Sequence, residues 1–494
     1  MSEAYLHGAY GQTQAAGNRV AAKCQNVMVL VGTAPVHTVF GGAENVNKPI
    51  LVHDIAEARR YFGYSDNWED YTLCEAMHMF LENKAVGPLV LINVLDPAKH
   101  TGEAGSVSLT PSNGRITIVG ADNIALDSVK VGSYALNTDY TISYNFQKKV
   151  ITIAEVVSGG LGTAAVEITY STVDPAAVTE NDVIGSTDGN GLNTGLYAVK
   201  NVYQITGYIP SFLLAPGFSS IPAVHAAMYA NSQKINNHWD AWMFVDLPIV
   251  DAEGTAITLD SAHTWRKANG YTKENETVCF PMILGTDGKH YHMSVVRAAN
   301  FAELLLANEG IPYHTASNTA APIIANLWLG EEGKNRVYDD ELVNKKLCSN
   351  GISSAAYIGG RFVVWGAHAA DYDSENKSEV NTSETTRMML YYVSNDFQHR
   401  RHYDVDKPLS SNDVSSIVAE EQTRLDALVK MGALTYGVAS LNADEIARSD
   451  MLNGDYVFTF SVTTTPLAKS LTAIVNWVDD GYTTYFAAYQ TVMA

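Results

Sequence analysis

Apolar runs typical of buried strands alternate with helical patterns in two stretches of the chain, residues 23–98 and 188–385. The run "VMVLVGTAP" predicts a buried strand that ends in a turn, and "GPLVLINVLD" is a continuous apolar strand of the kind found inside parallel sheets. "YTLCEAMHMFLEN" has apolar positions at helical spacing, and "AANFAELLLANEG" predicts a helix that ends at Gly310. This alternation indicates an α/β layer that is interrupted and then resumes.

The pattern changes near Lys99 and stays different to about Ser186. Short β-branched segments such as "RITIVG", "YTISYNF" and "AVEITYSTV" alternate apolar and polar positions, and turn sequences such as "SNG", "NTD" and "SGGLG" separate them. We therefore expect residues 99–187 to form a small all-β sandwich or barrel, inserted into the α/β part.

The last part of the chain begins near Glu384, where "TTRMMLYYVSNDF" predicts a helix. Ser410 can cap a second helix over residues 411–431, because Asp413 follows three residues later. Its apolar stripe comprises Val414, Ile417, Val418, Leu425 and Leu428. The segment "DYVFTFSVTTTPLAKSLTAIVNW" predicts a long amphipathic strand, with one face formed by Tyr456, Phe458, Phe460 and Val462.

Both ends of the chain look incomplete within one subunit. Residues 1–22 contain little that could form a core, whereas residues 481–494, "GYTTYFAAYQTVMA", predict a strand with two semi-apolar faces. Extended segments of this kind become stable when they add to the sheet edge of another subunit. We expect the contacts to come from Tyr5, Leu6, Tyr10, Tyr482, Tyr485, Phe486 and Tyr489, and the receiving sheet to contain Tyr456, Phe458, Phe460 and Val462.

Motifs that would carry catalysis or bind a cofactor or metal are not found in the sequence. "DGNGLNTGL" is one residue off the dinucleotide fingerprint, and no strand leads into it, which favours a flexible turn. His290 and His292 could share one face of a strand, but no third metal ligand is visible. The basic run His399, Arg400, Arg401 and His402 is open to two interpretations, a solvated loop or a contact with an acidic partner protein.

Composition narrows the range of partners and compartments. The formal net charge of −21 argues against nucleic acid as the main partner, and no apolar run reaches the roughly 18 residues of a membrane span. The N-terminus has no basic and apolar regions of a secretory signal, so synthesis in a cytoplasm is expected. The cysteines are far apart and are expected to be reduced and mostly buried: Cys24, Cys74, Cys279 and Cys348.

An ordered set of stretches resembles the tail sheath proteins of contractile-tailed phages and related R-type bacteriocins. The set comprises "YLHGAYGQ", "VNKPILVHDIAEARRYFG", "PLVLINV", "GLNTGLYAV", "PSFLLAPG", "GGRFVVWGAHAADYD", "DVDKPLSSNDVSSIVAEEQTRLDALVKMGAL" and "GDYVFTFSVTTTPLAKSLTAIVNW". The resemblance covers both ends and most of the α/β part, but not residues 99–187. One departure is His368, which follows "WGA" where the family often has arginine.

The resemblance implies a multidomain α/β and α+β protein. It has an N-terminal arm (1–22), a discontinuous outer α/β domain (23–98 and 188–385), an inserted β domain (99–187), an inner α+β domain (386–480) and a C-terminal strand arm (481–494). Such subunits form stacked hexameric rings around an inner tube, exchange their arms, and contract to drive the tube through a cell envelope.

The implied partners are further copies, the inner tube protein, and baseplate and tail terminator proteins, with no nucleic acid, membrane insertion, cofactor, metal or catalytic residue. The subunit would be made in a host bacterial cytoplasm and become part of a virion or particle tail. The helix at 411–431 and the run from His399 to His402 are candidates for tube or inter-subunit contacts. Two other functions stay open: a different structural homo-oligomer, such as a tube or shell protein, and a hydrolase acting on cell-wall sugars.

Overall fold

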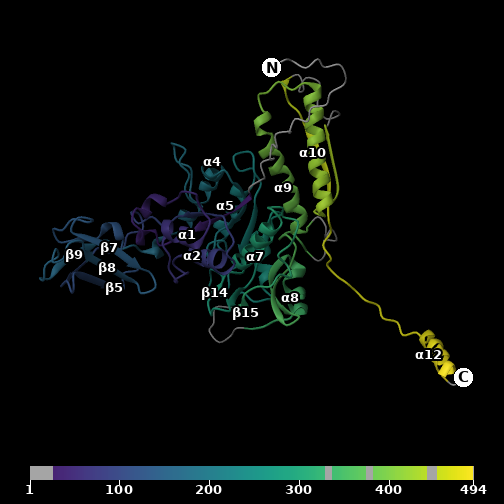
Figure 1. The fold of residues 1–494 in the computed structure, drawn as a ribbon, viewed down its shortest axis with the longest axis horizontal. Helices are drawn as coiled ribbons and strands as arrows, with labels where there is room; N and C mark the ends of the chain where they lie inside the picture. Colours follow the sequence, from purple (N-terminus) through teal and green to yellow (C-terminus); the bar gives the residue numbers. More distant parts are fainter. Residues whose placement is uncertain (1–25, 329–335, 374–381, 442–452, 493–494) are drawn as a thin grey trace, which may run out of the picture.

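The computed structural model describes residues 26–328, 336–373, 382–441 and 453–492. Its central part, which we call the body, is built on an eight-stranded sheet (Figure 1). The strands lie in the order β17 (Arg361–Trp365), β16 (Ile352–Ile358), β12 (Glu276–Cys279), β11 (Trp242–Asp246), β10 (Ile209–Leu214), β1 (Asn26–Gly32), β3 (Leu89–Asn93) and β2 (Ile50–Val52). The strands from β16 to β3 pair in parallel, and only the edge strands β17 and β2 are antiparallel to their neighbours.

Helices cover both faces of this sheet, because successive residues of a strand point to opposite sides. Met28 and Leu30 of β1 pack with α1 (Ile55–Phe62), α2 (Thr72–Ala76) and α7 (Met293–Ala307). Val29 and Val31 pack on the other face with α5 (Pro222–Ser232) and α9 (Glu384–Arg401). The mixed α/β class predicted from the sequence is therefore confirmed. The body also contains α3 (Glu180–Ile184), α4 (Val202–Thr206), α6 (Ala262–Ala268), α8 (Asp340–Lys346) and a small sheet of β14 (His290–Tyr291), β13 (Met282–Gly285) and β15 (Ile323–Trp328).

Residues 99–179, which we call the insert, contain two three-stranded sheets packed over one apolar core at one end of the molecule (Figure 1), whereas Val183 of α3 packs in the core of the body. One sheet has the order β4 (Gly105–Leu109), β9 (Val166–Tyr170), β6 (Lys130–Val131), and the other β5 (Arg115–Val119), β8 (Val150–Glu155), β7 (Tyr140–Asn145). Phe146, in the turn after β7, packs edge-on against Tyr64 of the body with ring centroids 5.3 Å apart. His37 Nε2 lies 2.8 Å from the carbonyl oxygen of Asp122, so the insert is held to the body by both apolar and polar contacts.

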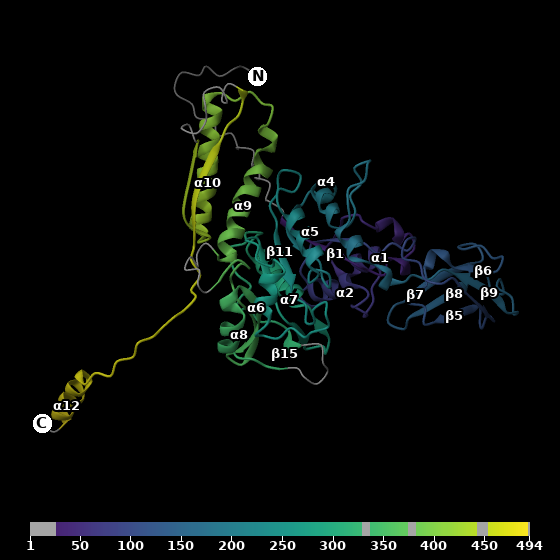
Figure 2. The same cartoon turned by 180° about the vertical axis from the view of Figure 1, so that it is seen from behind.

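The C-terminal unit comprises α9, α10 (Ser411–Met431), β18 (Leu434–Leu441) and β19 (Phe458–Thr464) and stands at the side of the body opposite the insert (Figures 1 and 2). The predicted cap of α10 is confirmed: Ser410 Oγ accepts from the backbone N–H of Asp413, and Asp413 Oδ2 accepts from that of Ser410 at 2.8 Å. Gly432 ends the helix in the left-handed region, at φ 87°.

The C-terminal end differs from the prediction in two ways. The long strand ends at Thr464, just before Pro466, and residues 465–478 are neither helix nor strand. The predicted strand at 481–494 is wrong for this structure, since Asp480–Val492 form helix α12. A strand needs a partner for its backbone groups, whereas a helix pairs them within the segment. The aromatic residues Tyr482, Tyr485 and Phe486 also stand at i, i+3 and i+4, the spacing of one helix face.

Candidate assembly interface

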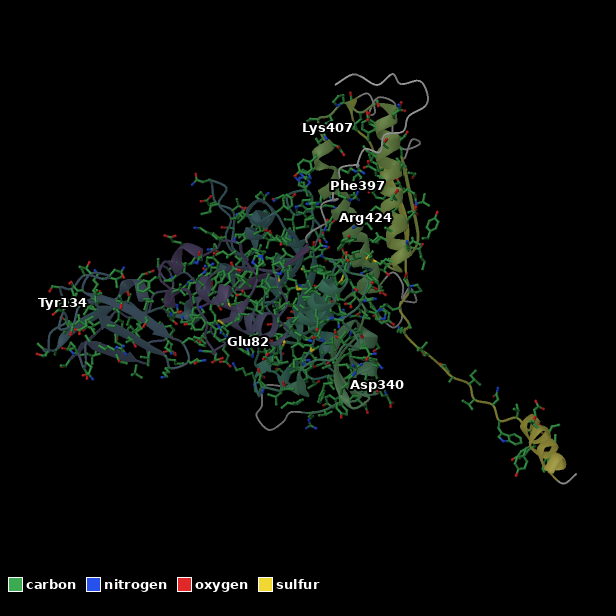
Figure 3. The ribbon with its side chains drawn as sticks, viewed as in Figure 1. Glu82, Tyr134, Asp340, Phe397, Lys407 and Arg424 are labelled. Carbon is green, nitrogen blue, oxygen red and sulfur yellow. The ribbon has the colours of Figure 1, made fainter. Side chains whose placement is uncertain are left out.

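The basic run at the end of α9 is bound within the subunit. The two terminal guanidinium nitrogens of Arg400, Nη1 and Nη2, donate to the carboxylate of Glu421 on α10 at 2.6 Å, and Arg401 Nε donates to the same carboxylate at 2.7 Å. Asp396 accepts from Arg400 and from Arg424, both at 3.1 Å. These charges lie between the two antiparallel helices, where Figure 3 shows Arg424 on α10 and Phe397 on α9.

This cluster changes the interpretation of the run from His399 to His402. It is not a loop: Arg401 is the last residue of α9, and the side chains of Arg400 and Arg401 are only 15% exposed. Burial lowers the pKa of Arg400, but its hydrogen bonds to Glu421 raise the pKa by more than burial lowers it. The net shift of the pKa is upward, so the guanidinium stays charged. His402 Nδ1 lies 2.7 Å from the carbonyl oxygen of His399. The two arginines are thus occupied in holding α9 to α10, which removes the basis for treating them as free contacts for a tube.

The strand face predicted from Phe458, Phe460 and Val462 is oriented toward the helices. The rings of Phe458 and Phe460 lie 5.8 and 5.2 Å from that of Phe397 on α9, and Val462 packs against the apolar core that contains Leu425 and Leu428 of α10. All three are only partly buried, as is Tyr456, which precedes β19. Among the described residues, β18 and β19 pair only with each other.

The side of α9 that lies next to β19 is also incompletely covered. Thr386 of α9 shares a 2.9 Å hydrogen bond with Thr464, and Phe397 contacts Phe460, so this side of α9 follows β19. Leu390 lies between them at helical spacing and is 46% exposed. An additional strand along β19 would therefore cover Leu390 and the aromatic rings.

Residues 465–492, which we call the arm, begin with a root that hydrogen bonds hold to the rest of the subunit. Thr465 Oγ1 donates to the carbonyl oxygen of Gly432 at 2.6 Å, and Lys469 Nζ lies 3.3 Å from the hydroxyl of Tyr372 in the body. Tyr372 is in turn stacked on His368, the residue that departs from the family pattern, with centroids 3.9 Å apart. The root of the arm is thus tied to both the unit and the body, and from there the arm runs outward (Figures 1 and 2).

The next part of the arm carries large apolar side chains in water. The exposed fractions are 90% for Leu471, 83% for Ile474, 90% for Val475, 78% for Trp477 and 63% for Val478. Isolated exposed apolar residues are ordinary, but a continuous run of them indicates a surface that another chain covers. The sequence pattern predicted that this segment continues a long strand of the inner domain and that the arm comprises only 481–494, and the exposed run corrects that prediction.

The C-terminal unit is joined to the body by a buried ion pair. Arg297 of α7 donates to Ser353 Oγ at 2.6 Å and to Glu384, the first residue of α9, at 2.7 Å. The side chains of Arg297 and Glu384 are 0% and 1% exposed. Because α9 runs without interruption from this pair to Arg401, it connects the body rigidly to the α9–α10 pair.

The histidine pair and the glycine-rich stretch, which the sequence singled out, contribute to the local fold. His292 precedes α7, and its Nδ1 lies 2.7 Å from Glu75, while His290 is in β14. Within the described ranges, no cluster of three or more His, Cys, Asp or Glu could hold a metal ion. The glycine-rich stretch forms a turn in which Asp188 Oδ1 accepts from the backbone N–H groups of Asn190 and Leu192. Tyr5, Leu6, Tyr10 and the side chain of Tyr489 lie outside the described residues.

Within the described parts of the chain, no helix is both long and apolar enough to cross a membrane. The described cysteines, Cys74, Cys279 and Cys348, are free thiols, and Cys24 lies outside the described residues.

The chain is similar to a curated protein and to several solved structures. The chain is 23% identical over 489 residues to the tail sheath protein of Burkholderia phage BcepMu, with 96% of each chain covered. No protein-family model matches it.

Two solved structures share its fold. One is a chain of the anti-feeding prophage baseplate, with a TM-score of 0.52, 13% identity and coverage of 97% of this chain and 99% of that one. The other belongs to the contracted PVC sheath complex of an extracellular contractile injection system, with a TM-score of 0.53, 12% identity and coverage of 98% and 100%. The chain therefore resembles a phage tail sheath protein along nearly its whole sequence and shares its fold with these two structures.

Proposed function

We propose that this protein is a structural subunit of a contractile tail sheath that polymerises around an inner tube as stacked hexameric rings. Contraction of the polymer drives the tube through a cell envelope, and the subunit acts without catalysis. Its partners are further copies of itself, the tube protein, and baseplate and terminator proteins. The observation that carries the proposal is the apolar arm, which leaves the subunit beside a two-stranded sheet whose aromatic face is half covered.

The arm segment 470–478 has the pattern of a strand that is buried on one face. In an extended chain, Leu471, Ala473, Val475 and Trp477 point to one side, while Thr472, Asn476 and Val478 share the other side with Ile474. One face is therefore wholly apolar and the other mixed, which is the pattern of a strand that covers a core. The exchanged strand is 470–478 in this proposal, upstream of the segment that the sequence pattern suggested.

The sheet of a neighbouring copy offers a matching edge. A strand added along β19 would place its apolar face over Phe460, Phe397 and Leu390, which are partly exposed in one subunit. Such a strand adds about four to six main-chain hydrogen bonds, each contributing about 0.5–1.5 kcal/mol net. The same subunit does not supply the strand easily, because Thr465 and Lys469 direct the arm away from its own sheet.

Truncation tests the proposal directly. The full chain is expected to form tubes that negative-stain electron microscopy shows, whereas a chain that ends at Lys469 is expected to stay folded and monomeric. Circular dichroism and sedimentation velocity check the fold and the mass. Polymers from the truncated chain at the same concentration as the full chain, or a full chain that stays monomeric at high concentration, would overturn the proposal.

A further inference from the structure

Helix α12 presents an aromatic stripe at the very end of the arm. Tyr482 and Tyr485 are each 54% exposed, and Phe486 is 59% exposed. Their i, i+3, i+4 spacing gathers them on one face, and the Tyr482 and Phe486 rings lie 6.2 Å apart. The polar residues Thr483 and Thr484 lie between these positions in the sequence, and the sequence of α12 contains no lysine or arginine.

The stripe is continuous with the apolar face of segment 470–478. The ring centroid of Trp477, the last apolar residue of that face, lies 6.3 Å from that of Tyr482 in the first turn of α12. Trp477, Tyr482 and Phe486 thus form one chain of ring contacts across the junction. The two elements present a single apolar surface, formed first by a strand and then by a helix.

The connection between segment 470–478 and α12 is too short for the two elements to contact two different molecules. Only Asp479 separates Val478 from the start of α12 at Asp480, and one residue of chain spans at most about 3.6 Å. Whichever chain lies under Trp477 must therefore also lie within reach of Tyr482. Figures 1 and 2 show α12 at the far end of the arm, away from its own body.

We propose that α12 keeps its helical form in the assembled sheath and docks, through Tyr482, Tyr485 and Phe486, on the same neighbouring copy that receives residues 470–478. The inference rests on the proposed arm exchange and adds a second anchor to it. A strand alone is held by an edge, whereas a strand followed by a docked helix is held at two sites, which raises the effective concentration of each.

Photo-crosslinking identifies what α12 touches. p-Benzoylphenylalanine at position 485 is placed in the full chain, and polymers are formed from a mixture of ¹⁵N-labelled and unlabelled copies. Mass spectrometry is expected to find mixed-isotope crosslinks between two sheath copies. Crosslinks only within one copy, only to added tube protein, or none at all in intact polymers would each overturn the proposal.

Paired substitutions test the helical form. Thr483→Ala with Thr484→Ala favours a helix, and Thr483→Val with Thr484→Val favours a strand. The alanine pair is expected to polymerise at the wild-type concentration or below, and the valine pair only at a higher one. The reverse order would show that the segment acts as a strand. Replacing Tyr482, Tyr485 and Phe486 by Ser should raise the required concentration about tenfold or more.

One further variant separates this inference from the proposed function. Val475→Asp changes segment 470–478 and leaves α12 intact. If Val475→Asp polymerises normally, the arm exchange itself is wrong. If it blocks polymerisation while the triple serine variant assembles like the wild type, the exchange stands and only the docking of α12 is overturned.

Discussion

The apolar face of the arm predicts that one charge has very different effects at two adjacent positions. Val475 and Asn476 point to opposite sides of an extended chain, and Val475 is 90% exposed in the single subunit. Burying Leu471, Val475 and Trp477 together would contribute about 5–9 kcal/mol gross, at about 1.5–3 kcal/mol each. Val475→Asp removes one of these contributions and also buries a carboxylate without a partner, so we expect a loss of about 4 kcal/mol per arm.

A loss of that size corresponds to a roughly thousandfold weaker arm contact. The assay is the lowest protein concentration at which polymers pellet and are seen by negative-stain microscopy. Asn476→Asp is the matched control, because it adds the same charge to a chain of net charge −21 on the mixed face. Both side chains lie outside the folded units, so circular dichroism should show an unchanged subunit. Equal polymerisation of the two variants would refute the assignment of the faces.

Three further predictions concern the connections within the subunit. Glu421→Gln should destabilise the α9–α10 pair by about 3 kcal/mol, measured by urea unfolding of an assembly-blocked chain, because it leaves the partly buried Arg400 without its main partner; an unchanged midpoint would contradict the ion-pair assignment. Burial lowers the pKa of His292, but the charge and hydrogen bond of Glu75 raise it further, to about 9. This pair should stabilise the fold fully below pH about 6.5 and lose its effect as the pH rises through about 9; His292→Gln should abolish that part of the pH dependence of thermal unfolding. Lys469→Met should preserve the fold and alter polymer yield or helical order in electron micrographs, since Lys469 ties the arm root to the body; unchanged polymers would show that the tie is dispensable.

Local patterns predicted the elements whose stabilising contacts come from nearby residues. Helix α10 begins at Ser411 as its cap at Ser410 indicates, because the cap and the apolar stripe lie within the helix itself. The apolar run "GPLVLINVLD" contains β3, a buried parallel strand, since a strand covered on both faces is apolar at every position. The face of Phe458 and Phe460 was also predicted correctly, because alternation alone decides which strand residues share a side.

The partners of charged side chains could not be predicted in this way. Arg400 and Arg401 looked like a free basic patch in an acidic chain, yet Glu421, some twenty positions later, pairs with both across the helix pair, and Asp396 and Glu420 supply further negative charge. The spacing shows that both helices exist, but only their packing decides which faces meet. The same holds for Arg297 and Glu384, which meet because α7 and the start of α9 both contact strands of the central sheet, at Ser353 and Thr277.

The C-terminal segment shows most clearly what the sequence determines and what the tertiary structure determines. The sequence by itself established that the C-terminal end is too apolar to remain in water, because that follows from residue types alone. It could not decide between strand and helix, since Tyr482, Tyr485 and Phe486 suit an alternating strand and a helical stripe alike. The tertiary structure decided this point: without a sheet edge within reach, the backbone pairs its own groups in α12 and leaves 470–478 exposed.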